Sequence, residues 1–253
     1  MTLTLTKHHG LGNDFLVLLD PPDDLDTAAL ARAVCDRHRG VGGDGLLVAR
    51  RGGVEADVTM ALHNADGGVA EMSGNGIRCL AQAVVDAGWQ RAGTFRIATA
   101  GGLRTVDVTE ETAPGLRQVT VEMGVAKVRE IEGGPTAMAA EVDMGNPHLV
   151  LLADATDLDV EALGREHPDV NVELVTPVDD GLVLKVHERG VGLTEACGTG
   201  SCAAAAAARR WGLVGDHVVV HNPGGDLAVD LHGDEVKLTG PAQFVARVEW
   251  PCR

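Results

Sequence analysis

The stretch EMSGNGIRCLAQAVVDAGW (residues 71–89) has a near copy later in the chain, EACGTGSCAAAAAARRWGL (residues 195–213). In both, a small side chain precedes a Gly-polar-Gly triplet, an apolar run follows, and Trp and Gly meet at the far end. The small residue is Ser73 in the first copy and Cys197 in the second. The repeated layout indicates an internal duplication whose two copies differ in one chemical group.

The two apolar runs predict helices over 76–88 and from about Thr199 to Trp211. A helix that is apolar on most faces must be buried. The segments around both runs have the length and alternation of strands. The sequence therefore predicts a mixed α/β (α+β) fold of two pseudo-symmetric domains, each a curled, mostly antiparallel sheet around one central buried helix.

The boundary between the halves is expected near residues 110–118, where TEETAPG is polar and rich in turn formers. The predicted N-terminal half covers 1–115 and the predicted C-terminal half covers 116–242. The last strand, 243–253, is expected to return to the first half, because FVARVEW has no obvious partner at the end of the second. Further predicted elements are helices over 26–38 and 160–167 and a single strand over 139–153.

The composition restricts the class of protein. A chain of 253 residues that is 45% hydrophobic and 2% aromatic is long enough for a sizeable aliphatic core. A net charge of -16 argues against a nucleic-acid partner, because neutralising phosphates requires clustered Lys and Arg. No apolar run reaches the roughly 18 to 20 residues of a membrane span, and the N-terminus lacks the layout of a signal peptide.

Cysteine usage and the one nucleotide-like motif argue against bound metals and cofactors. The cysteines are odd in number and include no CxxC pair, which fits a reduced cytoplasmic protein better than a disulfide framework or a zinc site. The stretch GVGGDG (40–45) satisfies GxGxxG, but a helix precedes it and a strand-like run follows. The dinucleotide fingerprint has the opposite order, so a glycine-rich turn is the better interpretation.

The motifs SGNG and CGTG point to acid–base chemistry on an anionic substrate. Free N–H groups in the first turn of a helix bind anions, and a cysteine at that position is expected to have a lowered pKa. For either motif alone, a glycine-rich cap with an ordinary small residue would explain the pattern equally well. Two such helix starts facing one cleft would hold a carboxylate and place acid–base groups on opposite sides of a carbon, as inversion of a stereocentre requires.

Polar residues at the predicted strand ends form a second set of candidates. Asparagine is common in turns for conformational reasons, and a Glu-Arg pair at the surface contributes little. Taken together, however, these amides and fork donors suit an amino-acid head group. They are Asn13, Asn64, Asn146 with His148, Asn171, and Glu188 with Arg189.

Along nearly its whole length the chain resembles the diaminopimelate epimerases, a pyridoxal-independent group of two-cysteine racemases. The resemblance implies an active site between two halves, a homodimer, diaminopimelate as small-molecule substrate, no cofactor, and a role in lysine and cell-wall precursor synthesis. It rests on the blocks HGLGNDFLVL (9–18), RGVGGDGLL (39–47), NADGGVAEMSGNGIRC (64–79), MGNPHLV (144–150), NVELV (171–175) and HERGVGLTEACGTGSCAAA (187–205).

The resemblance also assigns roles to single residues. It implies that Cys197 is one catalytic cysteine and that His148 and Glu188 tune the thiols. The paired helix starts that hold the reacting carboxylate would be Gly74-Asn75 and Gly198-Thr199. Substrate contacts are implied for Asn13, Asn64, Asn146, Asn171, Glu188 and Arg189.

Two positions depart from the family pattern. Gly45 stands where many relatives have a substrate-contacting Gln, so a contact there would come from the backbone. Ser73 stands where the family has its other catalytic cysteine, and a hydroxyl is a far weaker acid than a thiol. Cys79 does not substitute for the missing thiol, because six helical residues place it about 9 Å along and roughly 240° around the axis.

Four interpretations of Ser73 remain open from the sequence. Ser73 acts with a water or another group in a natural epimerase, or it is an engineered replacement in an epimerase. Alternatively, the chain is a one-base lyase or dehydratase of the same superfamily, in which Cys197 removes a proton and a leaving group departs, or it is another amino-acid racemase of that superfamily. The fourth interpretation is a non-catalytic protein that binds an amino acid.

Overall fold

The two helices that begin at the quoted motifs lie at the centres of two structural units. The computed structural model describes residues 2–132, 136–152 and 158–252. Unit 1 runs to Val121 and resumes at Gly240, and unit 2 covers Glu122–Thr239. Residues 1, 153 and 253, which end the predicted segments 1–115, 139–153 and 243–253, lie outside the described residues.

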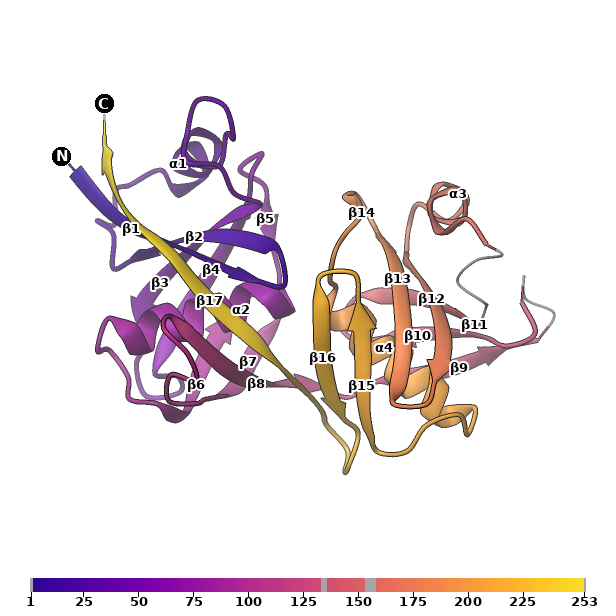
Figure 1. Ribbon diagram of the computed structural model, residues 1–253. Helices are drawn as coiled ribbons and strands as arrows, with labels where there is room; N and C mark the ends of the chain where they lie inside the picture. The colour runs from indigo at the N-terminus through magenta and orange to yellow at the C-terminus, as the bar shows by residue number, and fades with distance from the viewer. Residues whose placement is uncertain (1, 133–135, 153–157, 253) are drawn as a thin grey trace. The chain divides into compact units, whose positions relative to one another are not determined.

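Unit 1 is a sheet whose strands form a closed circuit around α2 (Figure 1). Strand β2 is antiparallel to β1 and parallel to β3, β3 is antiparallel to β4, and β4 is parallel to β6. Antiparallel pairs then lead from β6 through β7 to β8, and β17 joins β8 to β1. The elements are β1 (Thr2–Gly10), β2 (Asn13–Leu19), α1 (Thr27–Val34), β3 (Gly45–Arg51), β4 (Val58–Asn64), β5 (Val69–Ala70), α2 (Gly74–Asp86), β6 (Gly93–Thr99), β7 (Gly102–Val108), β8 (Leu116–Gly124) and β17 (Val236–Pro251).

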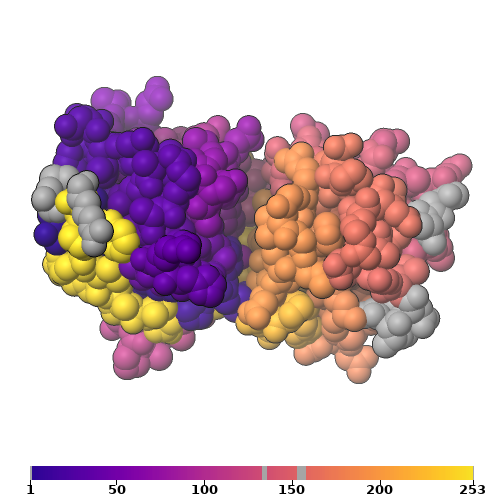
Figure 2. Space-filling model, turned by 90° about the horizontal axis from the view of Figure 1, so that it is seen from above, coloured from indigo at the N-terminus to yellow at the C-terminus, as the bar shows by residue number. Residues whose placement is uncertain are grey.

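The C-terminal strand completes unit 1. Strand β17 runs antiparallel to β1, from His9 opposite Gln243 to Thr2 opposite Pro251. Phe244 also donates its backbone N–H to the carbonyl of Gly115 at 2.8 Å. In the space-filling view, the yellow C-terminal segment and the indigo N-terminal segment lie together on unit 1 (Figure 2). The first strand of the chain therefore acquires its second neighbour only from the last strand.

Unit 2 builds a sheet of the same kind against α4. Strands β9, β10 and β11 are antiparallel, β11 is parallel to β12, β12 is antiparallel to β13, and β13 is parallel to β15. Antiparallel pairs β15–β16 and β16–β17 follow. The elements are β9 (Lys127–Ile131), β10 (Ala139–Asp143), β11 (Pro147–Leu152), α3 (Val160–Glu166), β12 (Asn171–Val178), β13 (Gly181–Glu188), β14 (Gly192–Leu193), α4 (Gly198–Arg210), β15 (His217–Asn222) and β16 (Gly225–Asp230).

The two units share one topology, element by element. The parallel pair β2–β3 with α1 between its strands corresponds to β11–β12 with α3 between them. The parallel pair β4–β6 with β5 and α2 between corresponds to β13–β15 with β14 and α4 between. The predicted fold class, a mixed α+β protein with a curled sheet around a buried helix in each half, is confirmed. None of the helices in the described part of the chain is long and apolar enough to cross a membrane.

Two predicted elements are wrong in extent. The helix predicted over 26–38 ends at Val34, because the Asp36 carboxylate accepts the backbone N–H groups of His38 and Arg39 and folds the chain into a turn. The strand predicted over 139–153 is a hairpin of β10 and β11. There Asp143 accepts the N–H of Gly145, whose φ of +95° suits the turn between them.

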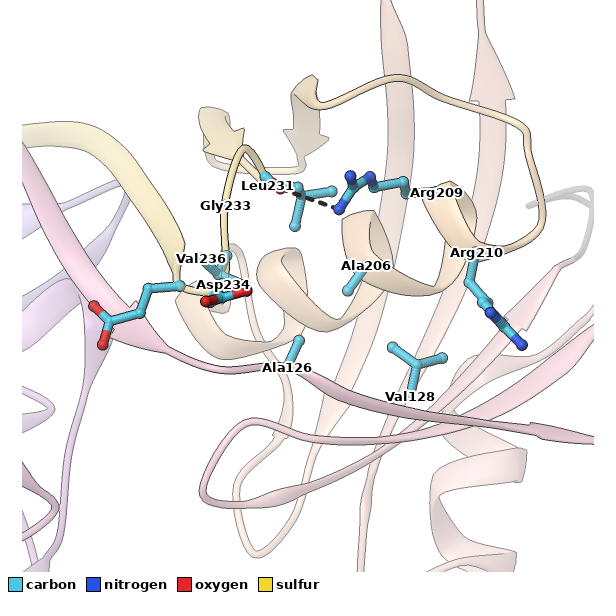
Figure 3. Close-up of a pocket in the computed structure, with 10 residues that line it drawn as sticks. Ala126, Val128, Ala206, Arg209, Arg210, Leu231, Gly233, Asp234 and Val236 are labelled. Carbon is cyan, nitrogen blue, oxygen red and sulfur yellow. Dashed lines mark hydrogen bonds between the residues drawn. The ribbon is translucent and has the colours of Figure 1, made fainter.

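Alanine makes the second helix narrow enough to be buried. Ala203, Ala204, Ala205, Ala207 and Ala208 are fully buried, whereas Ala206 is 8% exposed. Figure 3 shows Ala206 beside a pocket of about 480 Å³ within unit 2, near the C-terminal end of α4. One helix therefore presents both tightly packed alanines and an alanine with free space beside it.

This difference predicts two outcomes for one kind of substitution. Ala205→Leu forces three extra carbons into a filled core and should lower the free energy of unfolding by about 1–3 kcal/mol. Ala206→Leu extends into the pocket and should change it by no more than about 0.5 kcal/mol. Urea unfolding followed by circular dichroism measures both variants. Equal losses for the two variants would show that Ala206 is packed as tightly as Ala205.

Candidate functional site

Ser73 and Cys197 occupy the same structural position in their units. Each is the N-cap of its helix, with extended backbone at φ -138°, ψ 123° for Ser73 and φ -120°, ψ 116° for Cys197. Ser73 Oγ accepts the N–H of Gly76 at 3.0 Å, and Cys197 Sγ accepts the N–H of Gly200 at 3.3 Å. In both helices the N-cap side chain therefore binds the N–H group three residues further along.

In unit 1 the predicted site residues gather at one end of the sheet. Asn13 begins β2, Gly45 begins β3, and Asn64 ends β4 opposite Gly45. Asn75, in the first turn of α2, donates its amide to Asn13 Oδ1 at 3.2 Å, and Asn13 donates to Asp44 at 2.6 Å. The structure therefore joins Asn13 and Asn75 directly and places Gly45 and Asn64 on neighbouring strand ends.

Gly45 has no space for a side chain. A Cβ atom built there would lie 2.7 Å from the carbonyl oxygen of His63 and 3.3 Å from the ring of Phe15. Both the backbone of β4 and a buried ring would have to move to accept a larger residue. The glycine at this departure from the family pattern can thus offer only its backbone.

Arg78 is a buried cation that the sequence analysis did not single out. Its guanidinium is fully buried one turn into α2 and donates to the carbonyls of Gly74 at 3.0 Å and Pro241 at 3.3 Å. A third bond, to Asn75 Oδ1 at 2.9 Å, turns the amide nitrogen of Asn75 toward Asn13. A lone charge in the apolar run GIRCLAQAVV was the signal that could have identified it.

In unit 2 the predicted residues form a chain of contacts that ends at Cys197. Thr199 Oγ1 lies 3.5 Å from Cys197 Sγ and accepts the amide of Asn146 at 3.4 Å. Asn146 Oδ1 lies 3.0 Å from Nε2 of His148, near the start of β11. The other ring nitrogen, Nδ1, lies 2.6 Å from Oε1 of Glu173 in β12. Glu173 lies within the block NVELV but was not predicted as a site residue.

Asn171 is engaged by the protein backbone on both sides of its amide. Its nitrogen donates to the carbonyl of Pro147 at 2.9 Å, and its oxygen accepts the backbone N–H of Arg189 at 2.9 Å. Asn171 therefore holds the start of β11 to the turn after β13. Arg189 is exposed, and its guanidinium donates to the carbonyl of Asp169 at 3.4 Å.

Burial, more than the helix start, sets the acidity of Cys197. Desolvation raises the pKa of the Cys197 thiol well above its ordinary value, and the charges of Glu188 and Glu173 raise it further. The hydrogen bonds from Thr199 and Gly200 lower this pKa but do not outweigh burial. The expectation that the helix start leaves Cys197 with a lowered pKa is therefore wrong: the group is a thiol.

Glu188 is the carboxylate placed to exchange a proton with this thiol. It ends β13, accepts the Thr194 hydroxyl at 2.6 Å, and is hydrogen-bonded to Cys197. Burial raises the pKa of Glu188, against the lowering effects of Thr194 and Cys197. A carboxylate with a raised pKa beside a buried thiol is a suitable base for generating the thiolate.

The Ser73 half lacks these ionisable groups at the matching positions. In unit 1, Phe15 of β2 lies opposite Gly45 of β3, and in unit 2, His148 of β11 lies opposite Asn171 of β12. Phe15 therefore corresponds to His148. By the same registers, Leu47 corresponds to Glu173 and Asn64 corresponds to Glu188. Gly76 and Gly200 support this equivalence, because their nearest strand neighbours are Leu47 and Glu173.

The described residues offer no metal site, and the pocket lies elsewhere in unit 2. Over 2–132, 136–152 and 158–252, no group of three or more His, Cys, Asp or Glu side chains could hold a metal ion.

The pocket in Figure 3 is lined by Arg209 and Arg210, which end α4, whereas Cys197 precedes its first turn. Ala206, the first residue of α4 in the pocket lining, lies nine positions after Cys197, so the pocket is distinct from the candidate site.

The raised pKa of Cys197 predicts a specific pattern of alkylation. Modification by iodoacetamide, followed for the Cys197 peptide by mass spectrometry, should be slow at neutral pH and rise with pH. Glu188→Gln removes a neighbouring negative charge and should shift the midpoint to lower pH. Thr199→Val removes a stabilising hydrogen bond and should shift it to higher pH. A wild-type midpoint at or below the ordinary value of about 8.5 would contradict this electrostatic description.

Comparison with known proteins gives one consistent family. The family model for diaminopimelate epimerase matches residues 5–129 and 140–245. A diaminopimelate epimerase from Streptomyces coelicolor is 40% identical over 285 residues, covering 98% of this chain and 95% of the relative. The Microcystis aeruginosa enzyme of the same name is 36% identical over 288 residues, with 99% and 100% covered.

Solved structures share the fold at much lower identity. A phenazine biosynthesis protein of the PhzF family from Bacillus anthracis superposes with a TM-score of 0.79 at 14% identity, covering 100% of both chains. A hydroxyproline epimerase from Agrobacterium vitis superposes with a TM-score of 0.74 at 17% identity, covering 98% of this chain and 92% of that one. These similarities concern the fold alone.

Proposed function

The chain belongs to the diaminopimelate epimerase family, and from this membership we propose that it interconverts LL- and meso-2,6-diaminopimelate. The enzyme is an amino-acid isomerase that removes a proton from the α-carbon and returns one, as a step in lysine and peptidoglycan precursor biosynthesis. The observation that carries the proposal is Cys197 at the start of α4, hydrogen-bonded to the partly buried carboxylate of Glu188.

Cys197 supplies one of the two acid–base groups. Glu188 takes the thiol proton, and the resulting thiolate removes the α-proton of the substrate. In the reverse direction the thiol, whose pKa is raised by burial, returns a proton to the carbon. Thr199 and Gly200 direct hydrogen-bond donors at the sulfur and support the thiolate while it exists.

The first turns of α2 and α4 are proposed to bind the reacting carboxylate. Their N–H groups carry the positive ends of the two helix dipoles, which stabilise the negative charge that develops when the α-proton leaves. Gly74 and Asn75 would contribute from one half, and Gly198 and Thr199 from the other. The remaining predicted contacts to the substrate are Asn13, Gly45 through its backbone, Asn64, Asn146, Asn171, Glu188 and Arg189.

Ser73 is proposed to serve the opposite face of the carbon through a bound water. Its hydroxyl lies at the N-cap position that Cys197 occupies in unit 2, but the matching strand positions hold Phe15, Leu47 and Asn64. Nothing at those positions would activate a serine as a base. The serine can thus orient a proton donor, but it cannot replace the thiolate.

The same asymmetry favours one alternative function. With a single strong base, the Cys197 thiolate could remove the α-proton while a leaving group departs from the β-carbon, which makes a lyase or dehydratase. The ionisable groups concentrated in unit 2 are the observation that favours this alternative. It requires a substrate with a β-leaving group, such as a 3-hydroxy amino acid.

A cytoplasmic homodimer remains part of the proposal. All five cysteines are free, and Cys35, Cys79, Cys197 and Cys202 are buried, which is compatible with a reducing compartment. The two-copy state comes from the family resemblance.

Deuterium exchange tests the proposed activity. With LL-diaminopimelate in deuterated water, the wild-type protein should incorporate deuterium at the α-carbon, which mass spectrometry detects. Cys197→Ala removes the base and should abolish this exchange, whereas Cys252→Ala, far along the chain and partly exposed, should leave it unchanged. An absence of exchange in the wild type would refute diaminopimelate as substrate, and exchange by Cys197→Ala would refute the assigned base.

Restoring the second thiol tests the role of Ser73. Ser73→Cys places sulfur at an N-cap whose geometry already matches that of Cys197, and it should raise the epimerisation rate by roughly 10²-fold or more. The appearance of meso product measured by chromatography gives this rate. Unchanged epimerisation, together with dehydration of a 3-hydroxy amino acid by the wild type, would instead establish the lyase.

A further inference from the structure

A carboxylate that the proposed reaction does not use lies at the centre of unit 2. The side chains of Glu173 and His148 are both 0% exposed, and Oε1 of Glu173 lies 2.6 Å from Nδ1 of His148. Its second oxygen, Oε2, is buried with no hydrogen-bond partner among the described residues. Burying a carboxylate is costly unless a positive partner balances it. The position therefore requires an explanation beyond packing.

The contacts of His148 determine how many protons its ring carries. Nδ1 faces a carboxylate oxygen, and Nε2 faces Oδ1 of Asn146, whose amide nitrogen is committed to Thr199. Carboxylate and amide oxygens only accept hydrogen bonds, so both ring nitrogens need protons. A ring with both nitrogens protonated balances the negative charge of the Glu173 carboxylate, so this geometry describes a buried ion pair with no net charge.

The direction of each hydrogen bond then follows along the chain of contacts. His148 donates to Asn146, and Asn146 donates to Thr199 Oγ1 at 3.4 Å. The hydroxyl proton of Thr199 remains for Cys197 Sγ, 3.5 Å away. A donor aimed at sulfur favours the thiolate, and the Thr199 bond does lower the pKa of Cys197 against the effect of burial.

We propose that Glu173 is a positioning residue: as the buried counter-ion of His148, it keeps both ring nitrogens protonated and so directs the bonds of Asn146 and Thr199 toward the sulfur of Cys197. The proposal rests on the proposed proton transfer by Cys197. In this proposal His148 acts on Cys197 indirectly, because its hydrogen bond to Asn146 orients the groups that contact the sulfur.

The other carboxylates near His148 are bound elsewhere. Glu188, at the end of β13, accepts the Thr194 hydroxyl at 2.6 Å, and Asp143, at the end of β10, accepts the N–H of Gly145 at 2.8 Å. The charge of His148 is a small lowering influence on the pKa of both carboxyl groups, and burial still raises the pKa of Glu188 overall; neither group is hydrogen-bonded to the ring. Of the ionisable groups on β10, β12, β13 and α4, Glu173 is the one that contacts His148 directly.

The packing around Glu173 is built to admit it. A Cβ atom at Gly200 would lie 2.8 Å from Oε1 of Glu173, so the glycine in the first turn of α4 makes space for the carboxylate beneath the helix. In unit 1 the positions that correspond to His148 and Glu173 hold Phe15 and Leu47. The ion pair therefore belongs to the half that carries the thiol.

Nuclear magnetic resonance of protein labelled with ¹⁵N-histidine tests the proposal. At neutral pH both ring nitrogens of His148 should be protonated in the wild type. In Glu173→Gln one of them should lose its proton, and α-proton exchange should fall about tenfold or more. An unprotonated Nδ1 in the wild type, or a variant with unchanged ring state and unchanged exchange, overturns the proposal.

Two further variants separate positioning from folding. His148→Phe combined with Glu173→Leu installs the pair found in unit 1, so it should fold as the wild type does by circular dichroism and lose exchange as Glu173→Gln does. Gln82→Leu is the matched control, because Gln82 contacts the other fully buried histidine, His8, at 3.0 Å in unit 1. It should leave exchange and the His148 signals unchanged. Full exchange in the double variant, or an equal loss in Gln82→Leu, overturns the proposal.

The proposed function and this inference can fail independently. The ring state of His148 is measured without substrate, so it decides the role of Glu173 as counter-ion even with an inactive protein. If diaminopimelate shows no exchange in the wild type, the proposed substrate is wrong while the ring measurement still stands. If the wild type exchanges and Glu173→Gln does so equally well, only the inference about Glu173 is wrong.

Discussion

Each unit depends on burying most of one helix against its own sheet. The residues of α2 from Gly74 to Val84 are all buried, and in α4 the alanine run supplies a helix thin enough for its strands to surround. Such a helix must begin where the strands end, because only there can the chain leave the sheet and turn inward. The first-turn N–H groups, an N-cap side chain and several strand ends therefore collect at one place in each unit.

The two units use this common backbone for different electrostatics. In unit 1 a buried guanidinium, Arg78, lies behind the N-cap serine and fixes the amide of Asn75. In unit 2 the corresponding helix position holds Cys202, and the polar groups come instead from the strands as His148 and Glu173. The two units thus share the same N-capped helix start. The buried polar side chains near it differ, because unit 1 has the guanidinium of Arg78 and unit 2 has the His148–Glu173 pair.

This divergence explains why the acidity of Cys197 is not a property of its helix start alone. A helix N-terminus favours a thiolate, but desolvation and two nearby carboxylates oppose it, and the balance favours the thiol. A group held as a thiol can return a proton directly, but it needs a base beside it before it can accept one. Glu188, whose pKa is raised by the same burial, is that base.

Local sequence patterns predicted the elements well where one residue type dominates. The Gly-polar-Gly starts and apolar runs located α2 and α4 to within two residues, and the repeated spacing predicted two similar halves. The prediction was wrong where a single side chain redirects the backbone, as Asp36 and Asp143 do through bonds to nearby N–H groups. Such bonds compete with helix and strand continuation on equal terms, so composition alone does not reveal which one forms.

The sequence by itself determined the duplication, the N-cap positions of Ser73 and Cys197, and the family to which the chain belongs. Tertiary structure decided which polar groups meet and what charge they carry. Glu173 and His148 are 25 residues apart and become partners only because β11 and β12 are parallel neighbours. The pKa of Cys197 likewise depends on burial and on groups brought from other strands. Local patterns encode helix starts and strand periods, whereas desolvation and charge pairing arise from the packing of distant segments.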